Sequence, residues 1–194
     1  MYKRQVYFHG NKDNLKRWGK EVQPLLKFRY DVFVMDYRGY GKSIGKRTEK
    51  AMYDDALMFY EYVNQRFEEN KILLYGRSLG SVFATYVAGT KQPSKLILET
   101  PFYSMESVVK SKIPFLPTSL ILNFQFRTYQ FTKTVESPTL VLLSEQDEVV
   151  PFENGRKLSQ LFANSKRITI PKALHNNQAQ IDEYWYELEQ FLVH

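Results

Sequence analysis

Cysteine is absent from the 194 residues, which excludes disulfide bonds, zinc–thiolate sites and a thiol nucleophile. Histidine is scarce as well, because the chain contains only His9, His175 and His194. A metal site built from many histidines is therefore excluded. Any mechanism that needs an imidazole base has three candidates.

Long apolar runs are also missing. No run approaches the ~18 residues that a membrane span needs, and the first ten residues carry positive charge without the apolar stretch of a signal peptide. These absences predict a cytoplasmic protein, which becomes membrane-associated if an N-terminal extension precedes this sequence. Hydrophobic residues make up 43% and charged residues 25%, so the composition and length predict a single globular domain over residues 1–194.

Positive charge is concentrated at the start of the chain. Residues 1–50 contain 13 Lys/Arg against 5 Asp/Glu, a net charge of +8, whereas residues 51–194 contain 14 against 16, a net charge of −2. Such a region can attract an anionic membrane surface, an acidic substrate or nucleic acid. The alternative is a solvated lysine-rich surface, which the lack of any run of five basic residues favours.

Short β-branched and aromatic runs alternate with segments of helical period, which is the pattern of a parallel sheet covered by helices. The runs are apolar nearly throughout, as expected for strands buried on both faces. The expected strands are Gln5–His9, Val32–Asp36, Ile72–Tyr75, Leu96–Glu99, Thr139–Ser144 and Lys166–Ile170.

Apolar residues at spacings of three and four predict amphipathic helices between these strands. The expected helices are Asn14–Lys27, Glu49–Glu68, Val82–Ala88, Glu153–Phe162 and Gln180–Val193. Residues 101–136 break the rhythm, because they combine three prolines with seven aromatic residues. An apolar insertion of this length predicts a short cap or a pocket wall. Within it, Phe102 and Tyr103 are candidate pocket residues.

A Gly-x-Ser-x-Gly pattern, Gly76 to Gly80, follows the strand Ile72–Tyr75 directly and precedes a helix. This strand–turn–helix context is the one in which a serine nucleophile is held on a sharp turn. The backbone there is strained, and the flanking positions must lack bulk so that strand and helix can pass closely. Ser78 is therefore the candidate nucleophile.

A serine hydroxyl needs a base, and the base needs a carboxylate that orients it. His175 lies in the loop after the last predicted strand, and Asp147 lies in the loop after Thr139–Ser144. Asp147 is favoured over the two glutamates of the same loop, and Glu99, at the end of another strand, is the structural alternative. Arg77, beside the nucleophile, is a candidate pocket residue that could attract an anionic group of the substrate, although a surface or structural salt bridge is the favoured role.

Developing negative charge on a carbonyl oxygen must meet backbone N–H donors. Leu79 follows the nucleophile at the start of a helix and can supply one N–H group. We expect the second from Asn11, in the loop after Gln5–His9.

At this point the chain resembles the α/β-hydrolase superfamily, in particular its small single-domain serine hydrolases, a branch that includes membrane-associated enzymes acting on acyl esters and acyl thioesters. The nucleophile–acid–base order is typical of this superfamily. The resemblance extends over residues 5–192, and the segments that carry it are YFHGN at 7–11, DYRGYGKS at 36–43, YGRSLGS at 75–81, SEQDEVVP at 144–151 and ALHNN at 173–177.

The resemblance implies a mostly parallel six-stranded sheet with helices on both faces, an Asn11/Leu79 oxyanion hole, and neither a metal nor an organic cofactor. The chain departs from the family at Ser144 and Leu174, where glycine is more common. It also lacks the family's usual first two strands. The strand Val32–Asp36 then becomes an exposed sheet edge. A second copy of the chain in a homo-oligomer, a membrane or an N-terminal extension could cover that edge.

The sequence therefore predicts a serine hydrolase that cleaves a small-molecule carboxylic ester or thioester through an acyl-enzyme on Ser78. A peptidase or amidase of the same fold and a non-catalytic binding module remain open. A further alternative is a surface binder that uses the basic first 50 residues. An anionic membrane is the expected partner of such a surface, and nucleic acid is not expected.

Overall fold

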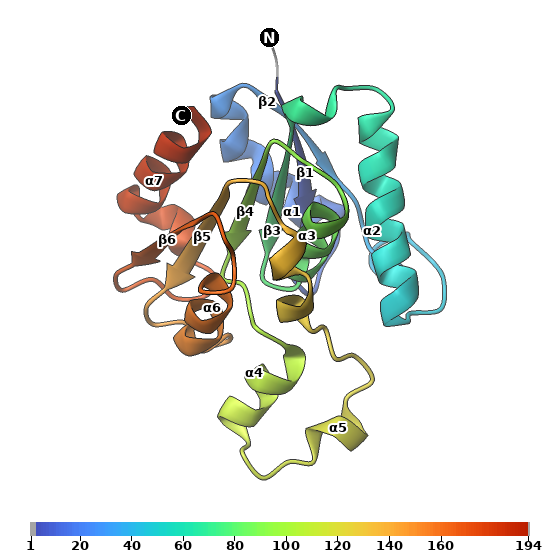
Figure 1. The fold of residues 1–194 in the computed structure, drawn as a ribbon, viewed down its shortest axis with the longest axis vertical. Coiled ribbons are helices and arrows are strands. Elements are labelled where there is room, and N and C mark those ends of the chain that lie inside the picture. Colours follow the sequence, from blue (N-terminus) through green and yellow to red (C-terminus); the bar gives the residue numbers. More distant parts are fainter. Residues whose placement is uncertain (1–2, 194) are drawn as a thin grey trace.

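The computed structural model describes residues 3–193, apart from the side chains of residues 119 and 120. Within this range six strands form one sheet in the order β2-β1-β3-β4-β5-β6, and every neighbouring pair is parallel (Figure 1). The prediction of a mostly parallel six-stranded sheet is confirmed. The strands are β1 (Lys3–Phe8), β2 (Tyr30–Val34), β3 (Ile72–Arg77), β4 (Lys95–Glu99), β5 (Thr139–Ser144) and β6 (Ser165–Ile170).

The strand order places the candidate site. Because all six strands are parallel, the loops that follow them lie at one edge of the sheet. The loops after β1, β3, β5 and β6 carry the candidate residues, and β3 lies between β1 and β4 in the sheet. Strand β2 is at one edge, as predicted, although it begins at Tyr30 and ends at Val34, two residues earlier than expected.

The α-helices of the described residues are α1 (Leu15–Val22), α2 (Glu49–Asn64), α3 (Leu79–Thr90), α4 (Met105–Lys112), α5 (Thr118–Ile121), α6 (Phe152–Ser159) and α7 (Asp182–Val193). Five of them follow predicted segments with shifted ends, whereas α4 and α5 lie in the segment 101–136, where no helix was predicted. Short 3₁₀ helices lie at Gln23–Phe28, Glu69–Lys71, Thr128–Gln130, Thr132–Thr134 and Gln178–Gln180.

One predicted helix, Asn14–Lys27, is divided in two. The Asn14 side chain caps α1 by accepting a hydrogen bond from the Lys16 N–H at 2.9 Å. The α-helix ends at Val22, because Pro24 has no N–H group to donate into it, and the chain continues as the 3₁₀ helix Gln23–Phe28.

Helices cover both faces of the sheet, as predicted (Figure 1). One buried cluster joins side chains of α2, α3 and α6 to one face of the strands, and the second joins α1 and α7 to the other face. Strand β3 lies in the middle of this sandwich, and all six of its residues are buried. The elbow that follows β3 therefore starts from a rigid strand.

The segment 101–136 departs from the layered arrangement. Helices α4 and α5 extend away from the carboxyl ends of the strands (Figure 1). The segment returns to the core at residues 125 and 126, whose backbone N–H groups both donate to the Glu49 carboxylate at the start of α2. No helix within residues 3–193 is long and apolar enough to cross a membrane.

Candidate active site

The turn between β3 and α3 holds Ser78 in a strained conformation, with φ of 50° and ψ of −114°. A Cβ atom at Gly76 would lie 2.6 Å from the carbonyl oxygen of Gly80, and one at Gly80 would overlap the carbonyl group of Phe8. Only glycine fits at either position. The steric requirement expected from the sequence is therefore met on both sides of the serine.

The structure brings the three side chains predicted for the triad into one hydrogen-bonded chain. His175 Nε2 lies 3.1 Å from Ser78 Oγ, and His175 Nδ1 lies 2.8 Å from Asp147 Oδ2. The histidine is 6% exposed and the Asp147 side chain 3% exposed, so little water competes for these contacts. These residues come from the loops after β3, β5 and β6.

Backbone donors fix the Asp147 carboxylate. Its Oδ1 accepts hydrogen bonds from the N–H groups of Val149 at 2.9 Å and Val150 at 2.7 Å. Glu148, which the sequence did not single out, accepts the N–H of His175 at 2.9 Å, and this bond is the largest cause that lowers the pKa of Glu148. Adjacent carboxylates in one loop therefore hold the ring and the backbone of the same histidine.

Arg77, a candidate pocket residue, does not line the cavity; it forms the structural salt bridge that the sequence favoured over a contact with substrate. Its Nε lies 3.2 Å from the Glu99 carboxylate, and its Nη2 donates to the carbonyl oxygen of His175 at 3.4 Å. Burial opposes the charge of Arg77, but the facing Glu99 carboxylate raises its pKa. Arg77 lies two residues after Tyr75 in β3, so it points to the face of the sheet that packs against α1 and α7 and not to the cavity. Glu99, bound also by Tyr75 at 2.6 Å, is not in contact with the imidazole.

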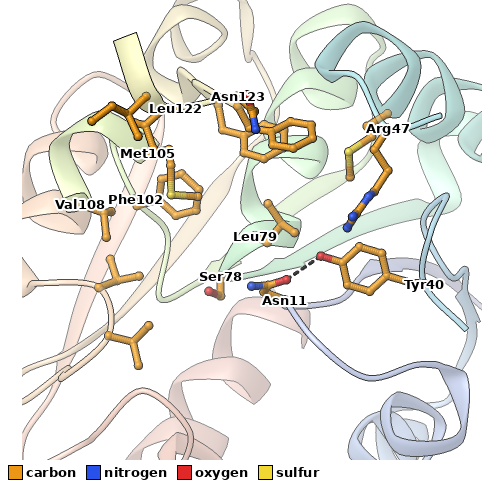
Figure 2. A pocket seen from close by; sticks show the side chains of 16 residues that line it. Asn11, Tyr40, Arg47, Ser78, Leu79, Phe102, Met105, Val108, Leu122 and Asn123 are labelled. Carbon is orange, nitrogen blue, oxygen red and sulfur yellow. Dashed lines mark hydrogen bonds between the residues drawn. The ribbon is translucent and has the colours of Figure 1, made fainter. Parts of the chain in front are cut away.

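A cavity of about 540 Å³ opens above Ser78, and both predicted oxyanion residues, Asn11 and Leu79, line it (Figure 2). Of the candidate pocket residues in the insertion, Phe102 lines this cavity. Tyr103 does not line it, because its ring stacks on Tyr129 at a centroid distance of 4.6 Å. The other lining residues are Tyr40, Arg47, Met52, Met105, Val108, Ile121, Leu122, Asn123, Phe124, Phe126, Val149 and Val150.

Comparisons with known proteins identify the family and the fold of the chain. Residues 3–126 match the model of the family described as serine aminopeptidase, S33. The chain belongs to this family. This family of serine hydrolases lies within the α/β-hydrolase superfamily. The match therefore confirms the predicted superfamily and the predicted fold class.

The relatives of this chain include a viral protein and an animal lipase. It is 33% identical to protein R595 of Acanthamoeba polyphaga mimivirus, over 94% of this chain and 70% of that protein. It is also 33% identical to the lysophosphatidylserine lipase ABHD12 of Danio rerio, over 84% of this chain. The chain covers 48% of that lipase, about half its length.

Solved structures share the fold at lower sequence identity. The monoacylglycerol lipase of Paleococcus ferrophilus superposes with a TM-score of 0.74 and 19% identity, over 98% of this chain and 93% of that one. This likeness shows that the S33 chain has the fold of α/β-hydrolases.

Among the cavity residues that sequence reasoning missed, Tyr40 and Arg47 are the two polar ones outside the segment 101–136. Tyr40 and Arg47 line the cavity from the loop after β2, and the Tyr40 hydroxyl donates to Asn11 Oδ1 at 2.5 Å (Figure 2). Their position after a strand, at the edge where the other candidates lie, is the signal that identifies them. Within residues 3–193 no group of three or more acidic or histidine side chains could hold a metal ion. His194, the third histidine, lies outside the described residues.

Proposed function

We propose that the protein hydrolyses carboxylic esters with an apolar acyl chain, through an acyl-enzyme formed on Ser78. The observation that carries this proposal is the hydrogen-bonded chain from Ser78 through His175 to Asp147, which begins at the floor of a mainly apolar cavity. Membership of a hydrolase family supports the reaction class. The acyl ester and the residue roles are the proposal.

In the first half-reaction His175 acts as the base. An ionised Asp147 can only accept hydrogen bonds, so Nδ1 of His175 carries the proton and Nε2 is left to accept the proton of Ser78. The serine oxygen attacks the ester carbon, and the imidazolium returns the proton to the departing alcohol. Asp147 stabilises the imidazolium that forms between these steps.

The oxyanion of each tetrahedral intermediate needs donors beside Ser78. Leu79 is the first residue of α3, and the first N–H groups of a helix have no partner inside it. The second donor is the N–H of Asn11, whose side chain is held by Tyr40. In the second half-reaction His175 activates water, which releases the acid and restores Ser78.

The cavity lining supports an acyl chain as the acid part. Apolar side chains from α3, from the segment 101–136 and from the loop before α6 supply most of its wall. Relatives named as lipases are consistent with such a substrate. We propose that 101–136 acts as the cap of a single domain and closes the cavity over the acyl chain.

A series of p-nitrophenyl esters of increasing acyl length tests the proposal. We expect kcat/KM to rise from acetyl to medium and long chains, and to disappear in Ser78→Ala. Matched thioesters and amides in the same assay distinguish the leaving group. A preference for acetyl esters or peptides over every longer chain would contradict an acyl-chain pocket.

A peptidase or amidase activity is the second candidate, and one observation favours it: the matching family carries the description serine aminopeptidase. A panel of aminoacyl p-nitroanilides discriminates between the two candidates. Cleavage of these amides faster than of any ester would replace the esterase proposal. A binding module with an unused triad predicts turnover of neither substrate class.

The tip of the segment 101–136 is a candidate contact with a membrane surface. Phe115 is 98% exposed, and Ile113 and Ile121 are each 54% exposed, so these apolar side chains lie in water. Lys110 and Lys112, at the end of α4, add positive charge close to them. We propose that this tip lies on an anionic lipid surface, from which an acyl ester reaches the cavity beside Ile121.

Co-sedimentation with vesicles tests the membrane contact. We expect binding to phosphatidylglycerol vesicles that weakens in Phe115→Ser and with added salt, and little binding to neutral vesicles. Equal binding by the native protein and Phe115→Ser would contradict it. A cytoplasmic location and a homo-oligomer formed through the β2 edge also stay predictions. Light scattering of the native protein tests the oligomer.

A further inference from the structure

The cavity has two unlike arms, which meet at Ser78. Figure 2 shows Phe102, Met105 and Val108 on one side of the serine, and Tyr40 and Arg47 on the other. The first arm is apolar, whereas the second ends in a guanidinium group. An ester bound with its carbonyl carbon at Ser78 has an acid part and an alcohol part, which leave the reacting carbon in different directions.

The charge of Arg47 has no counterion in the part of the chain that the structure describes. No carboxylate there forms an ion pair with it, although Arg38 in the same loop is held by both oxygens of Asp55 at 2.6 Å. The nearest acidic residue along the chain, Glu49, is already bound to two backbone N–H groups of the segment 101–136. Glu49 lines a neighbouring pocket together with Arg47 but forms no ion pair with it. Arg47 is exposed and lines the main cavity as well, so its guanidinium can meet an anion that enters the cavity from solvent.

The direction of the Arg47 side chain is set by packing. Its aliphatic stem lies against Gly39, where an added Cβ would be 2.8 Å from Arg47 Cδ. The guanidinium points toward the ring of Tyr40 (Figure 2). Burial raises the pKa of Tyr40, and the charge of Arg47 acts in the opposite direction. The positive field of Arg47 thus reaches the hydroxyl that is bonded to Asn11.

We propose that Arg47 binds an anionic group, a phosphate or a carboxylate, on the alcohol part of the ester, while the acyl chain occupies the apolar arm. The inference rests on the proposed esterase function and adds its leaving group. Ser78 attacks the carbonyl carbon, the bond to the alcohol oxygen breaks, and His175 protonates that oxygen. The alcohol then leaves with its anionic group, and water releases the acid. Arginine suits this role because its planar donors match phosphate and carboxylate oxygens.

Matched substrates test the proposal. A monoacylglycerol, its phosphate ester and an acyl ester of glycolic acid share one acyl chain and differ in the charge and chemistry of the alcohol part. We expect the native protein to prefer the anionic substrates, with a KM that rises with added salt. In Arg47→Gln the ratio of kcat/KM for the phosphate ester to that for the neutral ester should fall roughly tenfold. Comparing phosphate with carboxylate shows which anion is preferred.

Two control variants separate a specific contact from general charge. Lys46→Gln removes the same charge one residue away, outside the cavity lining, and should keep the native ratio within about threefold. Arg47→Lys keeps the charge and should retain part of the preference. An unchanged ratio in Arg47→Gln, or an equal fall in Lys46→Gln, would overturn the proposal. A loss in Arg47→Gln confined to half-esters of dicarboxylic acids would place the anion on the acid part and also overturn it.

A binding measurement separates this inference from the proposed function. The dissociation constant of the phosphate ester for Ser78→Ala, with and without Arg47→Gln, requires no turnover. We expect roughly tenfold weaker binding in the double variant. If this difference is found but the native protein hydrolyses none of the esters, the esterase proposal is refuted and the anion site is supported. Equal dissociation constants would refute the anion site whatever the activity.

Discussion

The elbow region, residues 72–90, and the cap segment, residues 101–136, both contribute to the cavity wall but differ in what fixes them. In the elbow region every residue of β3 is buried. Gly76 packs against the carbonyl oxygen of Gly80, and Gly80 packs against the carbonyl group of Phe8. In the cap segment α4 has no buried residue among those described, and Phe115 is 98% exposed. The difference suggests that the elbow region determines the reaction and the cap segment selects the substrate.

The largest expected effect concerns the acid loop that serves the elbow region. Asp147→Asn should lower kcat by roughly 10⁴-fold, because the histidine loses the partner that fixes its tautomer and stabilises its charge. Steady-state kinetics measures this loss of kcat, and an unchanged unfolding temperature shows that the variant is still folded. Glu148→Gln is the matched control, since the Glu148 carboxylate accepts the backbone N–H of His175 and is not bonded to its ring, and should cost less than about tenfold. A similar loss in both variants would contradict the assignment of Asp147.

A methyl group added at the elbow should disturb the fold itself. Gly80→Ala forces Cβ into the Phe8 carbonyl, so we expect a loss of about 3–4 kcal/mol and an unfolding temperature roughly 10 °C lower. Gly19→Ala in α1 meets no atom within 4 Å and should be neutral or slightly stabilising. Thermal unfolding followed by circular dichroism compares the two. Equal midpoints would show that the elbow is less tightly packed than described.

A bulky residue in the cap segment should change selectivity instead of stability. Val108→Trp narrows the apolar arm, so kcat/KM for long-chain esters should fall roughly tenfold relative to the acetyl ester. Ile113→Trp in the same segment, outside the cavity lining, is the control and should keep the native ratio. A uniform loss across all chain lengths in Val108→Trp would break the proposed division of roles.

The smallest expected effect is a pH dependence of the free energy of unfolding that arises from His9, which follows β1. Burial lowers the pKa of His9, whose ring is stacked on Trp18 at 5.3 Å, although Asp36 acts in the opposite direction. As pH falls through about 6.5, the unfolded chain binds a proton that the native His9 does not. The native state should therefore lose about 1 kcal/mol between pH 7 and 5.5. Urea unfolding should show a weaker pH dependence in His9→Asn, and an identical dependence would contradict the burial effect.

The sequence predicted the elbow region better than the cap segment for a physical reason. The glycines around Ser78 are required by contacts within one strand–turn–helix unit, so their role is visible locally. Arg47 lies 13 residues after the end of β2, so its position after a strand places it near the site edge, but only the packing of that loop brings its side chain to the cavity. The helices of the cap segment were not predicted either, since prolines interrupt their apolar spacing.

Two errors could have been avoided. The break in the predicted helix Asn14–Lys27 lies where Pro24 indicates it. The pocket role considered for Arg77 conflicts with strand alternation, because Arg77 lies two residues after Tyr75 and shares its face of the sheet, whereas the cavity residues Leu79 and Phe102 pack on the other face. Both features, a helix break at a proline and the face on which a strand residue points, follow from backbone geometry that the sequence indicates. The choice between Asp147 and Glu99 required the fold, since both follow strands at the same edge.

Covalent labelling tests most directly whether Ser78 is the nucleophile of this S33-family protein. A fluorophosphonate probe should label the native protein once, on the peptide that contains Ser78, as mass spectrometry of a digest can locate. Ser78→Ala should remain unlabelled, and Asp147→Asn should react much more slowly. A folded native protein that is not labelled, or is labelled on another serine, would contradict the account.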